Sequence, residues 1–230
     1  MTRFFHVYNR GVDKRKVFLN DKDRVRFLHD LYEFNNKQSS NGLTKHHLAS
    51  SENLDVRRQD SWKKRREPVV QIHCFCLMPN HYHLLVSPID DDMENLSLFM
   101  KKLGGGYTKA FNEKYERNGA LWQGKYKKVE IATDAHFLYL PFYIHFNPLD
   151  LNMPKWRKGS LSNCREAEEY LQSYRWSSHS DYLGKKNFPS ITDRKFFLDL
   201  LGGEEGYEKQ MRALLKSRSI MSELEGITLE

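Results

Sequence analysis

The stretch from residue 68 to residue 88, PVVQIHCFCLMPNHYHLLVSP, limits the possible folds more than any other part of the chain. Two apolar runs meet there at Met78-Pro79-Asn80, and a Pro-Asn pair marks a turn. Each run is short and rich in β-branched and aromatic side chains, which is typical of buried strands. The stretch therefore predicts a β-hairpin in the middle of a domain.

The residues before the hairpin predict a strand followed by a helix. RFFHVYNRG, residues 3–11, is a short β-type run that ends in an Asn-Arg-Gly turn. Residues 18–37 carry apolar side chains at helical spacing, with Asn20 or Asp21 as the N-terminal cap. The apolar positions of this helix are Val25, Leu28, Leu31, Tyr32 and Phe34.

The residues after the hairpin predict helix, strand and helix. Residues 93–119 return to helical periodicity, with a weak point at Gly104–Gly106, and residues 120–132 read as a strand. Residues 133–148 predict a helix that opens at Thr133 and stops at Asn147-Pro148, with Pro141 expected to kink it. The order β-α-β-β-α-β-α predicts an α+β fold: a ferredoxin-like antiparallel sheet with helices on one face.

The chain of 230 residues suits one large domain with additions. We expect the main domain in residues 1–150 and a C-terminal helical extension in 151–230, packing on the domain or on DNA. A polar insert, about residues 36–67, has no periodicity and ends in a basic cluster at 63–66. The cluster is either a solvated charge run or an arm that contacts DNA.

Composition narrows the class of protein. The net charge of +7 and the pI of about 9.2 favour a polyanionic partner. Three cysteines, an odd count without zinc spacing, argue against a disulfide scaffold and a structural zinc. Cys74 and Cys76 are expected in the core. The first residues contain no apolar signal region, and no run approaches a membrane span, so we expect a cytosolic protein.

His81 and His83 are the first candidates for chemistry. Side chains alternate along a strand, so the two imidazoles share one face while Tyr82 points to the other. With Cβ atoms roughly 7 Å apart they can share a metal ion or a phosphate. The alternative is two unrelated histidines near a strand end, one of them bonded to a backbone carbonyl.

Tyr143 and Asn147 are the candidates to complete that site. Residues i and i+4 of a helix lie one above the other, so these two side chains share a face. The amide oxygen of Asn147 could join the two histidines as a metal ligand, with Tyr143 beside the ion. Alternatively, Tyr143 is a core aromatic and Asn147 ends the helix before Pro148.

Four motifs, in the order HVYNRG, LMPNHYHLL, GALWQGKYK and YIHFNP, resemble the REP-associated tyrosine transposases. These are IS200-like members of the single-tyrosine HUH transposases. The motifs run from His6 to Pro148, and YRWSSHSDYLG, residues 174–184, is similar to the family's C-terminal segment.

The resemblance implies a function and an HUH endonuclease-type fold. His81, His83 and Asn147 would bind one divalent metal ion, Mg²⁺ or Mn²⁺, and Tyr143 would be the nucleophile that cuts single-stranded DNA. The 5′ phosphate would stay on the tyrosine while a free 3′-OH leaves. Substrates would be short palindromes that form hairpins, and the protein would act as a monomer or homodimer.

Elementary chemistry explains why such a site needs a cation. A phenol with a pKa of about 10 is a weak nucleophile at neutral pH. A divalent ion polarises a phosphate oxygen and stabilises the charge that develops during attack. The phosphotyrosine link conserves bond energy, so the step can be reversed onto another 3′-OH without ATP.

Several residues are candidates for DNA contacts. Asn9 and Arg10 can bond base edges, and Lys14, Lys16 and Lys125 can bind phosphates. Trp122 can stack on an unpaired base. The alternative is that Asn9-Arg10-Gly11 only turns the chain between strand and helix.

Two rival functions remain at this level. One is a non-catalytic hairpin DNA-binding protein derived from a transposase, which the basic charge and aromatic residues would also suit. The other is a zinc hydrolase using His81 and His83, which lacks a carboxylate at a suitable spacing.

Overall fold

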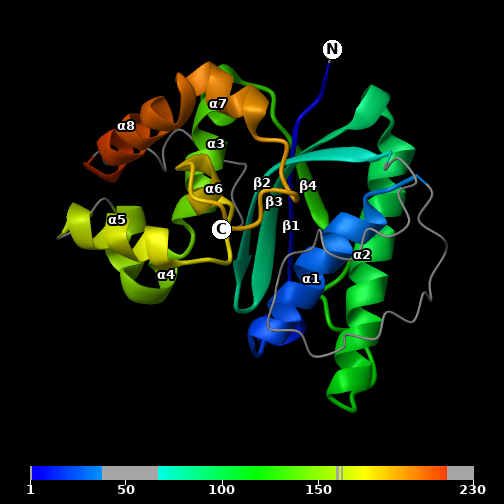
Figure 1. Cartoon of the computed structure of the whole chain (residues 1–230). Coiled ribbons are helices and arrows are strands. Elements are labelled where there is room, and N and C mark those ends of the chain that lie inside the picture. The colour runs from blue at the N-terminus through cyan, green and yellow to red at the C-terminus, as the bar shows by residue number, and fades with distance from the viewer. Residues whose placement is uncertain (1, 38–66, 159–160, 162, 217–230) are drawn as a thin grey trace.

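In a computed structural model of the chain, which describes residues 2–37, 67–158, 161 and 163–216, one four-stranded antiparallel sheet lies between two helical layers (Figure 1). The strands are β1 (Phe5–Arg10), β2 (Val70–Met78), β3 (His81–Pro88) and β4 (Lys127–Glu130). Their order in the sheet, β2-β3-β1-β4, is that of the ferredoxin-like fold, so the predicted α+β architecture is confirmed.

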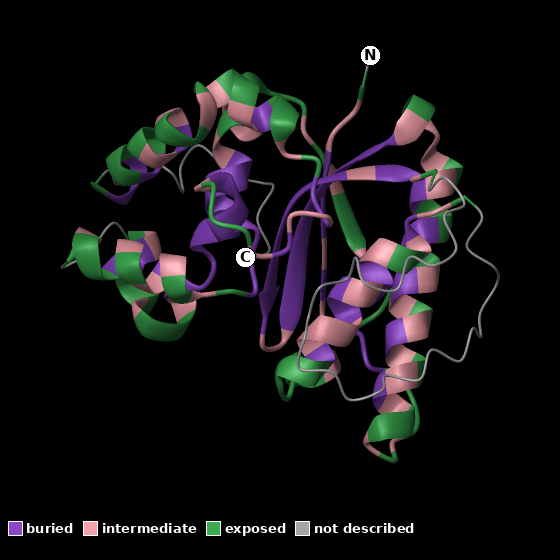
Figure 2. Cartoon of the chain, in the orientation of Figure 1, coloured by how far each residue is buried: buried purple, intermediate pink, exposed green. Residues whose placement is uncertain are grey.

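The predicted hairpin is formed by β2 and β3, which pair from Val70↔Pro88 to Met78↔His81. Almost every residue of both strands is buried, because helices cover both faces of the sheet (Figure 2). A β-bulge at His73 shifts the register between Ile72 and Cys74. Cys74 and Cys76 are fully buried in the core, as expected.

One helical layer consists of α1 (Asp21–Phe34) and α2 (Met93–Lys114). Asn20 caps α1 in a capping box with Asp23, which confirms one of the two predicted caps. The glycines of α2 allow a close approach rather than a break: a Cβ on Gly106 would lie 2.7 Å from the ring of Phe34 on α1. Phe5, Val7, Tyr82 and Leu84 fill the core beneath this layer.

The second face of the sheet is covered by α3 (Asp134–Phe146), which Thr133 caps as predicted. The sequence predicted helices on one face only, but α3 and the C-terminal helices form a second layer (Figure 1). Pro141 lies inside α3 without ending it. The remaining helices of this layer are α4 (Leu149–Asn152), α5 (Cys164–Ser173), α6 (His179–Tyr182), α7 (Lys195–Leu201) and α8 (Gly203–Lys216), and short 3-10 turns lie at Val12–Lys14, Ile89–Asp91 and Pro154–Lys158.

Buried hydrogen bonds join the C-terminal helices to α3. The hydroxyl of Tyr207 on α8 lies 2.8 Å from Nδ1 of His145 and 2.7 Å from Nδ1 of His179. Nε2 of His145 lies 2.8 Å from the hydroxyl of Ser178, which in turn accepts a bond from the backbone of Phe75 on β2. The C-terminal residues therefore help to fix the position of α3 on the sheet.

The polar insert lies largely outside the described residues, as does its basic cluster at 63–66. Its flanks are adjacent, because the backbone N–H of Lys37 donates to the carbonyl of Glu67 at 2.8 Å. Within the described part of the chain, no helix combines the length and the apolar character needed to cross a membrane.

Candidate active site

Three histidines gather on the face of the sheet that α3 covers. His83 lies opposite Tyr8 in the sheet register, and His81 lies opposite Arg10. Strand alternation sends His81 and His83 to the same face, with ring centroids 4.9 Å apart. His6 of β1 joins them, with its ring stacked on His83 at 5.1 Å. The sequence analysis assigned no role to His6, although it quoted the HVYNRG motif that contains it.

Hydrogen bonds orient the two rings of the pair. Nδ1 of His83 lies 2.9 Å from Nε2 of His6, and Nδ1 of His81 lies 2.6 Å from the side-chain oxygen of Asn80. An amide oxygen only accepts, so Nδ1 of His81 carries the proton and its Nε2 keeps a lone pair. Nε2 of His83 is buried and has no hydrogen-bond partner among the described residues. Such outer partners commonly orient histidines that bind a metal.

The electrostatic environment keeps both imidazoles neutral. Burial lowers the pKa of His81 to about 3, and the charge of Arg10 adds to this effect. Burial, followed by the neighbouring His81 and His6, holds the pKa of His83 well below its usual value. A neutral imidazole is the form that binds a metal.

The structure brings Tyr143 and Asn147 to the histidine pair. Both lie at the end of α3, and the ring of Tyr143 stands edge-on to His83, with centroids 5.8 Å apart. The amide nitrogen of Asn147 donates to the carbonyl of Tyr143 at 2.8 Å, and its side chain also hydrogen-bonds to His81. Tyr143 and Asn147 are fully buried.

Arg157 is the residue of this site that the sequence analysis missed. Its guanidinium carbon lies 5.2 Å from the centre of the Tyr143 ring, and its Nη2 donates to the side-chain oxygen of Asn147 at 3.2 Å. Asp150 holds it through two bonds, Nε to Oδ1 at 2.8 Å and Nη2 to Oδ2 at 2.6 Å. No spacing rule links residue 157 to residue 143, so only the fold could place it here.

The charge of Arg157 is preserved despite its burial. Burial by itself lowers the pKa of the guanidinium. The hydrogen bond to Asp150 and the nearby side chain of Tyr143 outweigh this effect and hold the pKa above its usual value. The ring of Trp156 lies beneath the guanidinium at 4.8 Å, and its Nε1 donates to Asp150 at 2.6 Å. The cation is therefore fixed in place next to the tyrosine.

The donor atoms suit one divalent ion. The described residues contain no group of three or more His, Cys, Asp or Glu arranged for a metal, and the candidate set is instead two imidazoles and one amide. The unpartnered Nε2 of His83 and the lone pair on Nε2 of His81 are the nitrogen donors. The side-chain oxygen of Asn147, which also accepts a bond from Arg157 at 3.2 Å, is the candidate oxygen donor.

The residues expected to contact DNA fall into two groups. Lys14, Lys16 and Lys125 are exposed, and Arg10 is half-buried beside His81. Asn9 and Trp122 are buried on the opposite face, under α1 and α2.

Asn9 and Trp122 are held by contacts within the protein. The amide of Asn9 bonds to the carbonyl of Gly124 at 3.1 Å and to its neighbour's backbone N–H at 2.9 Å. The ring of Trp122 packs against Tyr82 at 5.3 Å and Tyr107 at 6.0 Å. The turn interpretation thus fits Asn9, whereas Arg10 faces the histidine site.

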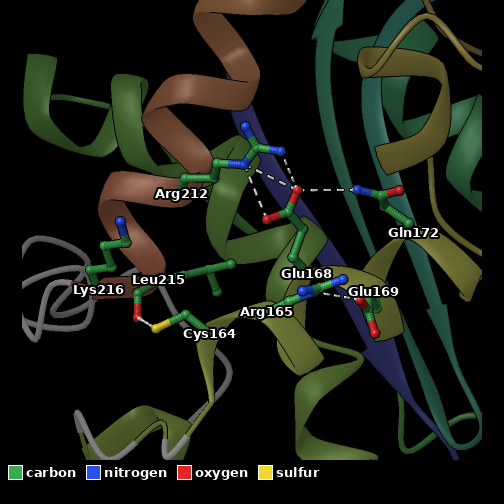
Figure 3. A pocket seen from close by; sticks show the side chains of 8 residues that line it. All are labelled: Cys164, Arg165, Glu168, Glu169, Gln172, Arg212, Leu215 and Lys216. Atoms are coloured by element: carbon green, nitrogen blue, oxygen red, sulfur yellow. Dashed lines mark hydrogen bonds and ion pairs between the residues drawn. The ribbon is translucent and has the colours of Figure 1, made fainter.

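Away from the histidine site, a hollow lies between α5 and α8 (Figure 3). Its charged side chains are paired with each other: Arg212 with Glu168 at 2.7 Å, and Arg165 with Glu169 at 3.0 Å. None of the residues that line the hollow belongs to the histidine site. This hollow is separate from the histidine site.

Comparisons with known proteins bear on the site. Residues 51–147, which contain both histidines, Tyr143 and Asn147, match the model of a family described as IS200-like transposases. No curated protein sequence matches the chain. A solved structure described as a REP-associated tyrosine transposase bound to a REP hairpin aligns over 83% of this chain and 84% of its own, with 12% identity and a TM-score of 0.44.

Proposed function

We propose that this chain, whose residues 51–147 match the model of the IS200-like transposases, cuts and rejoins single-stranded DNA at sites that form hairpins. The observation that carries the proposal is the meeting of Tyr143 with His81, His83 and Asn147 within one chain. A phenol beside a group of neutral metal-type ligands is an arrangement that suits metal-assisted phosphoryl transfer to tyrosine.

In this proposal each side chain has one role. His81, His83 and Asn147 would hold Mg²⁺ or Mn²⁺, which when bound polarises the scissile phosphate. Asn80 keeps His81 in the required tautomer through a bond of 2.6 Å, and His83 would donate its Nδ1 proton to His6, 2.9 Å away. Tyr143 attacks the phosphorus, loses its phenolic proton, and forms a phosphodiester with the 5′ phosphate. The 3′-oxygen leaves, takes up a proton and becomes a free 3′-OH.

The exposed basic residues would bind the rest of the substrate. Lys14, Lys16 and Lys125 are placed to contact the phosphates of a duplex stem, which carry little sequence information. Arg10 lies at the histidine site, where the unpaired flank must enter, so it is our candidate for contact with a base of that flank.

The test is formation of a covalent protein–DNA adduct. Purified protein is incubated with Mn²⁺ and an end-labelled hairpin that carries a single-stranded flank, and the products are separated on a denaturing gel. We expect a labelled band at the mass of protein plus DNA fragment. Tyr143→Phe should bind the hairpin with unchanged affinity and form no adduct, because only the attacking hydroxyl is removed.

Tyr107→Phe is the matched control. Tyr107 is also fully buried, but on the other side of the sheet, where its hydroxyl donates to the carbonyl of Val17 at 2.6 Å. It should retain the adduct, as should Tyr139→Phe one turn before Tyr143. An adduct that survives Tyr143→Phe would overturn the assignment of the nucleophile. Hairpin binding without any adduct in the wild type would favour the non-catalytic DNA-binding protein.

A further inference from the structure

The nucleophile of the proposed reaction is covered by one cationic side chain. Tyr143 has no exposed surface, and the Arg157 side chain above it is 12% exposed. Burying a cation is costly unless hydrogen-bonded anions and acceptors surround it. Asp150 supplies the anion, and Asn147 and Tyr143 supply further contacts. Such a costly arrangement directly on a reactive tyrosine points to a role in the chemistry.

Asp150 and Trp156 fix the position of Arg157. Both oxygens of Asp150 accept bonds from the guanidinium, and Trp156 both lies beneath it and bonds to Asp150. A bidentate arginine–carboxylate pair fixes the plane of the guanidinium as well as its location. The guanidinium is thereby held 5.2 Å from the centre of the Tyr143 ring, next to the place where the phenol must meet phosphorus.

The place of the scissile phosphate follows from the proposed attack. An attacking oxygen and the phosphorus must come within roughly 3–3.5 Å of each other before they react. A guanidinium whose carbon lies 5.2 Å from the centre of the Tyr143 ring is then also close enough to reach the oxygens on that phosphorus. Arginine is suited to this task because its planar fork matches the geometry of a phosphate.

We propose that Arg157 binds the scissile phosphate and is a further catalytic residue of this site. The inference rests on the proposed function of Tyr143. When the phosphate enters, the guanidinium exchanges its contact with Tyr143 for the phosphate oxygens and stays anchored to Asp150. Arg157 then neutralises charge on those oxygens during attack, while the hairpin stem is held elsewhere by exposed lysines.

The test separates the rate of the chemical step from DNA affinity. Arg157→Ala is compared with wild type in single-turnover adduct formation, at saturating Mn²⁺ and hairpin, and in hairpin binding without metal. We expect the adduct rate to fall about 100-fold or more, the loss that follows removal of one preorganised transition-state donor. The Kd for the hairpin should change less than threefold, because one phosphate contact among many is lost.

Arg212→Ala is the matched control. Arg212 also forms a bidentate pair, with Glu168, but at the hollow between α5 and α8 (Figure 3). This variant should react within twofold of wild type. Added guanidinium should restore at least tenfold of the rate of Arg157→Ala, whereas urea should not, because only the cation replaces the missing group. Arg157→Lys should react faster than Arg157→Ala, since it restores the charge without the fork.

The outcomes distinguish this inference from the proposed function. An Arg157→Ala protein that reacts within threefold of wild type would refute the phosphate role and leave Tyr143 as the nucleophile. A slow variant that neither guanidinium nor lysine improves would also refute it, since the defect would then be structural. If Arg157→Ala does not fold, Asp150→Asn replaces it, and an unchanged adduct rate in that variant is the refuting result. A wild type that forms no adduct would overturn both proposals.

Discussion

The two faces of the sheet are built from the same strands but do different work. On the face beneath α1 and α2, Phe5, Val7, Tyr82 and Leu84 form an apolar core. The neighbouring residues in the sequence point to the face beneath α3, and they include His6, Tyr8, His81 and His83. One face is an apolar interior, and the other carries buried polar groups that need partners.

The difference shows how one pair of strands can serve as both core and active site. Alternation along β1 and β3 puts every second residue on each face, so the sequence can vary the two faces independently. The apolar face supplies hydrophobic burial, and the polar face is rigid because that burial holds the strands in register. Buried histidines are tolerated on this scaffold because outer residues satisfy most of their nitrogens.

The largest effect is expected from the loss of a histidine on the polar face. His83→Ala should lower adduct formation more than 1000-fold and weaken Mn²⁺ binding, because a ligand nitrogen is removed. His81→Ala should behave in the same way. Adduct assays and calorimetric titration with Mn²⁺ provide the two measurements.

Two controls keep that result specific. Tyr82→Phe changes the apolar face between the two histidines, and His73→Ala removes a buried histidine of β2 that bonds to Ser87 at 2.8 Å. Both should bind Mn²⁺ and form the adduct at wild-type levels when assayed below their melting temperatures. Normal Mn²⁺ affinity in both His81→Ala and His83→Ala would remove the metal site from consideration.

A second prediction compares the faces through one pair of neighbours. Leu84 and Leu85 are adjacent and buried, but Leu84 faces α1 and α2 while Leu85 faces α3. Each change to Ala should lower the free energy of unfolding by about 2–5 kcal/mol, measured by urea denaturation. Only Leu85→Ala should also slow adduct formation, because a cavity beneath α3 lets Tyr143 shift. Equal rates in the two variants would show that α3 is held independently of Leu85.

A third prediction concerns acid. Burial lowers the pKa values of His73 and His179 to about 4, so both are neutral in the folded protein. The unfolded chain binds protons below its ordinary histidine pKa of about 6.5, so stability is complete above that pH and is lost as the pH falls from 6.5 towards 4. The shift corresponds to at most about 3 kcal/mol per histidine.

Hydrogen exchange can locate that loss. Because His145 lies on α3 and both His145 and His179 bond to Tyr207 on α8, amides of α3 and α8 should lose protection at pH 5 before those of α1 and α2. His179→Asn should flatten the dependence of unfolding free energy on pH, measured by urea titrations at pH 5 and pH 7. Simultaneous loss of protection in both layers would mean that they unfold as a single unit.

The smallest expected effect is on DNA binding, and it distinguishes Arg10 from its neighbour Asn9 in β1. Arg10→Ala should cost about 1–3 kcal/mol in binding the preferred single-stranded flank and little for a scrambled flank. Asn9→Ala should lower stability instead, because the bond from its side chain to Gly124 is lost, and it should leave flank preference unchanged. Lys14→Ala and Lys16→Ala should weaken both flanks alike and reduce the salt dependence. Hairpin titrations at two salt concentrations compare these variants, and equal losses on both flanks for Arg10→Ala would rule out base reading.

The sequence by itself determined the order of strands and helices, the hairpin, the caps at Asn20 and Thr133, and the pairing of His81 with His83 on one face. It also placed Tyr143 and Asn147 one above the other. These features depend on interactions between residues a few positions apart, which propensity and periodicity describe well.

The tertiary structure alone decided which groups meet across the chain. It brought His6 to His83 and Arg157 to Tyr143, and it buried Asn9 and Trp122 in the apolar core. It also covered the second face of the sheet with helices whose position on the sheet the sequence did not predict. The physical reason is that such contacts depend on strand register, a bulge at His73 and the path of the chain after α3. None of these is encoded in the spacing of the residues that meet.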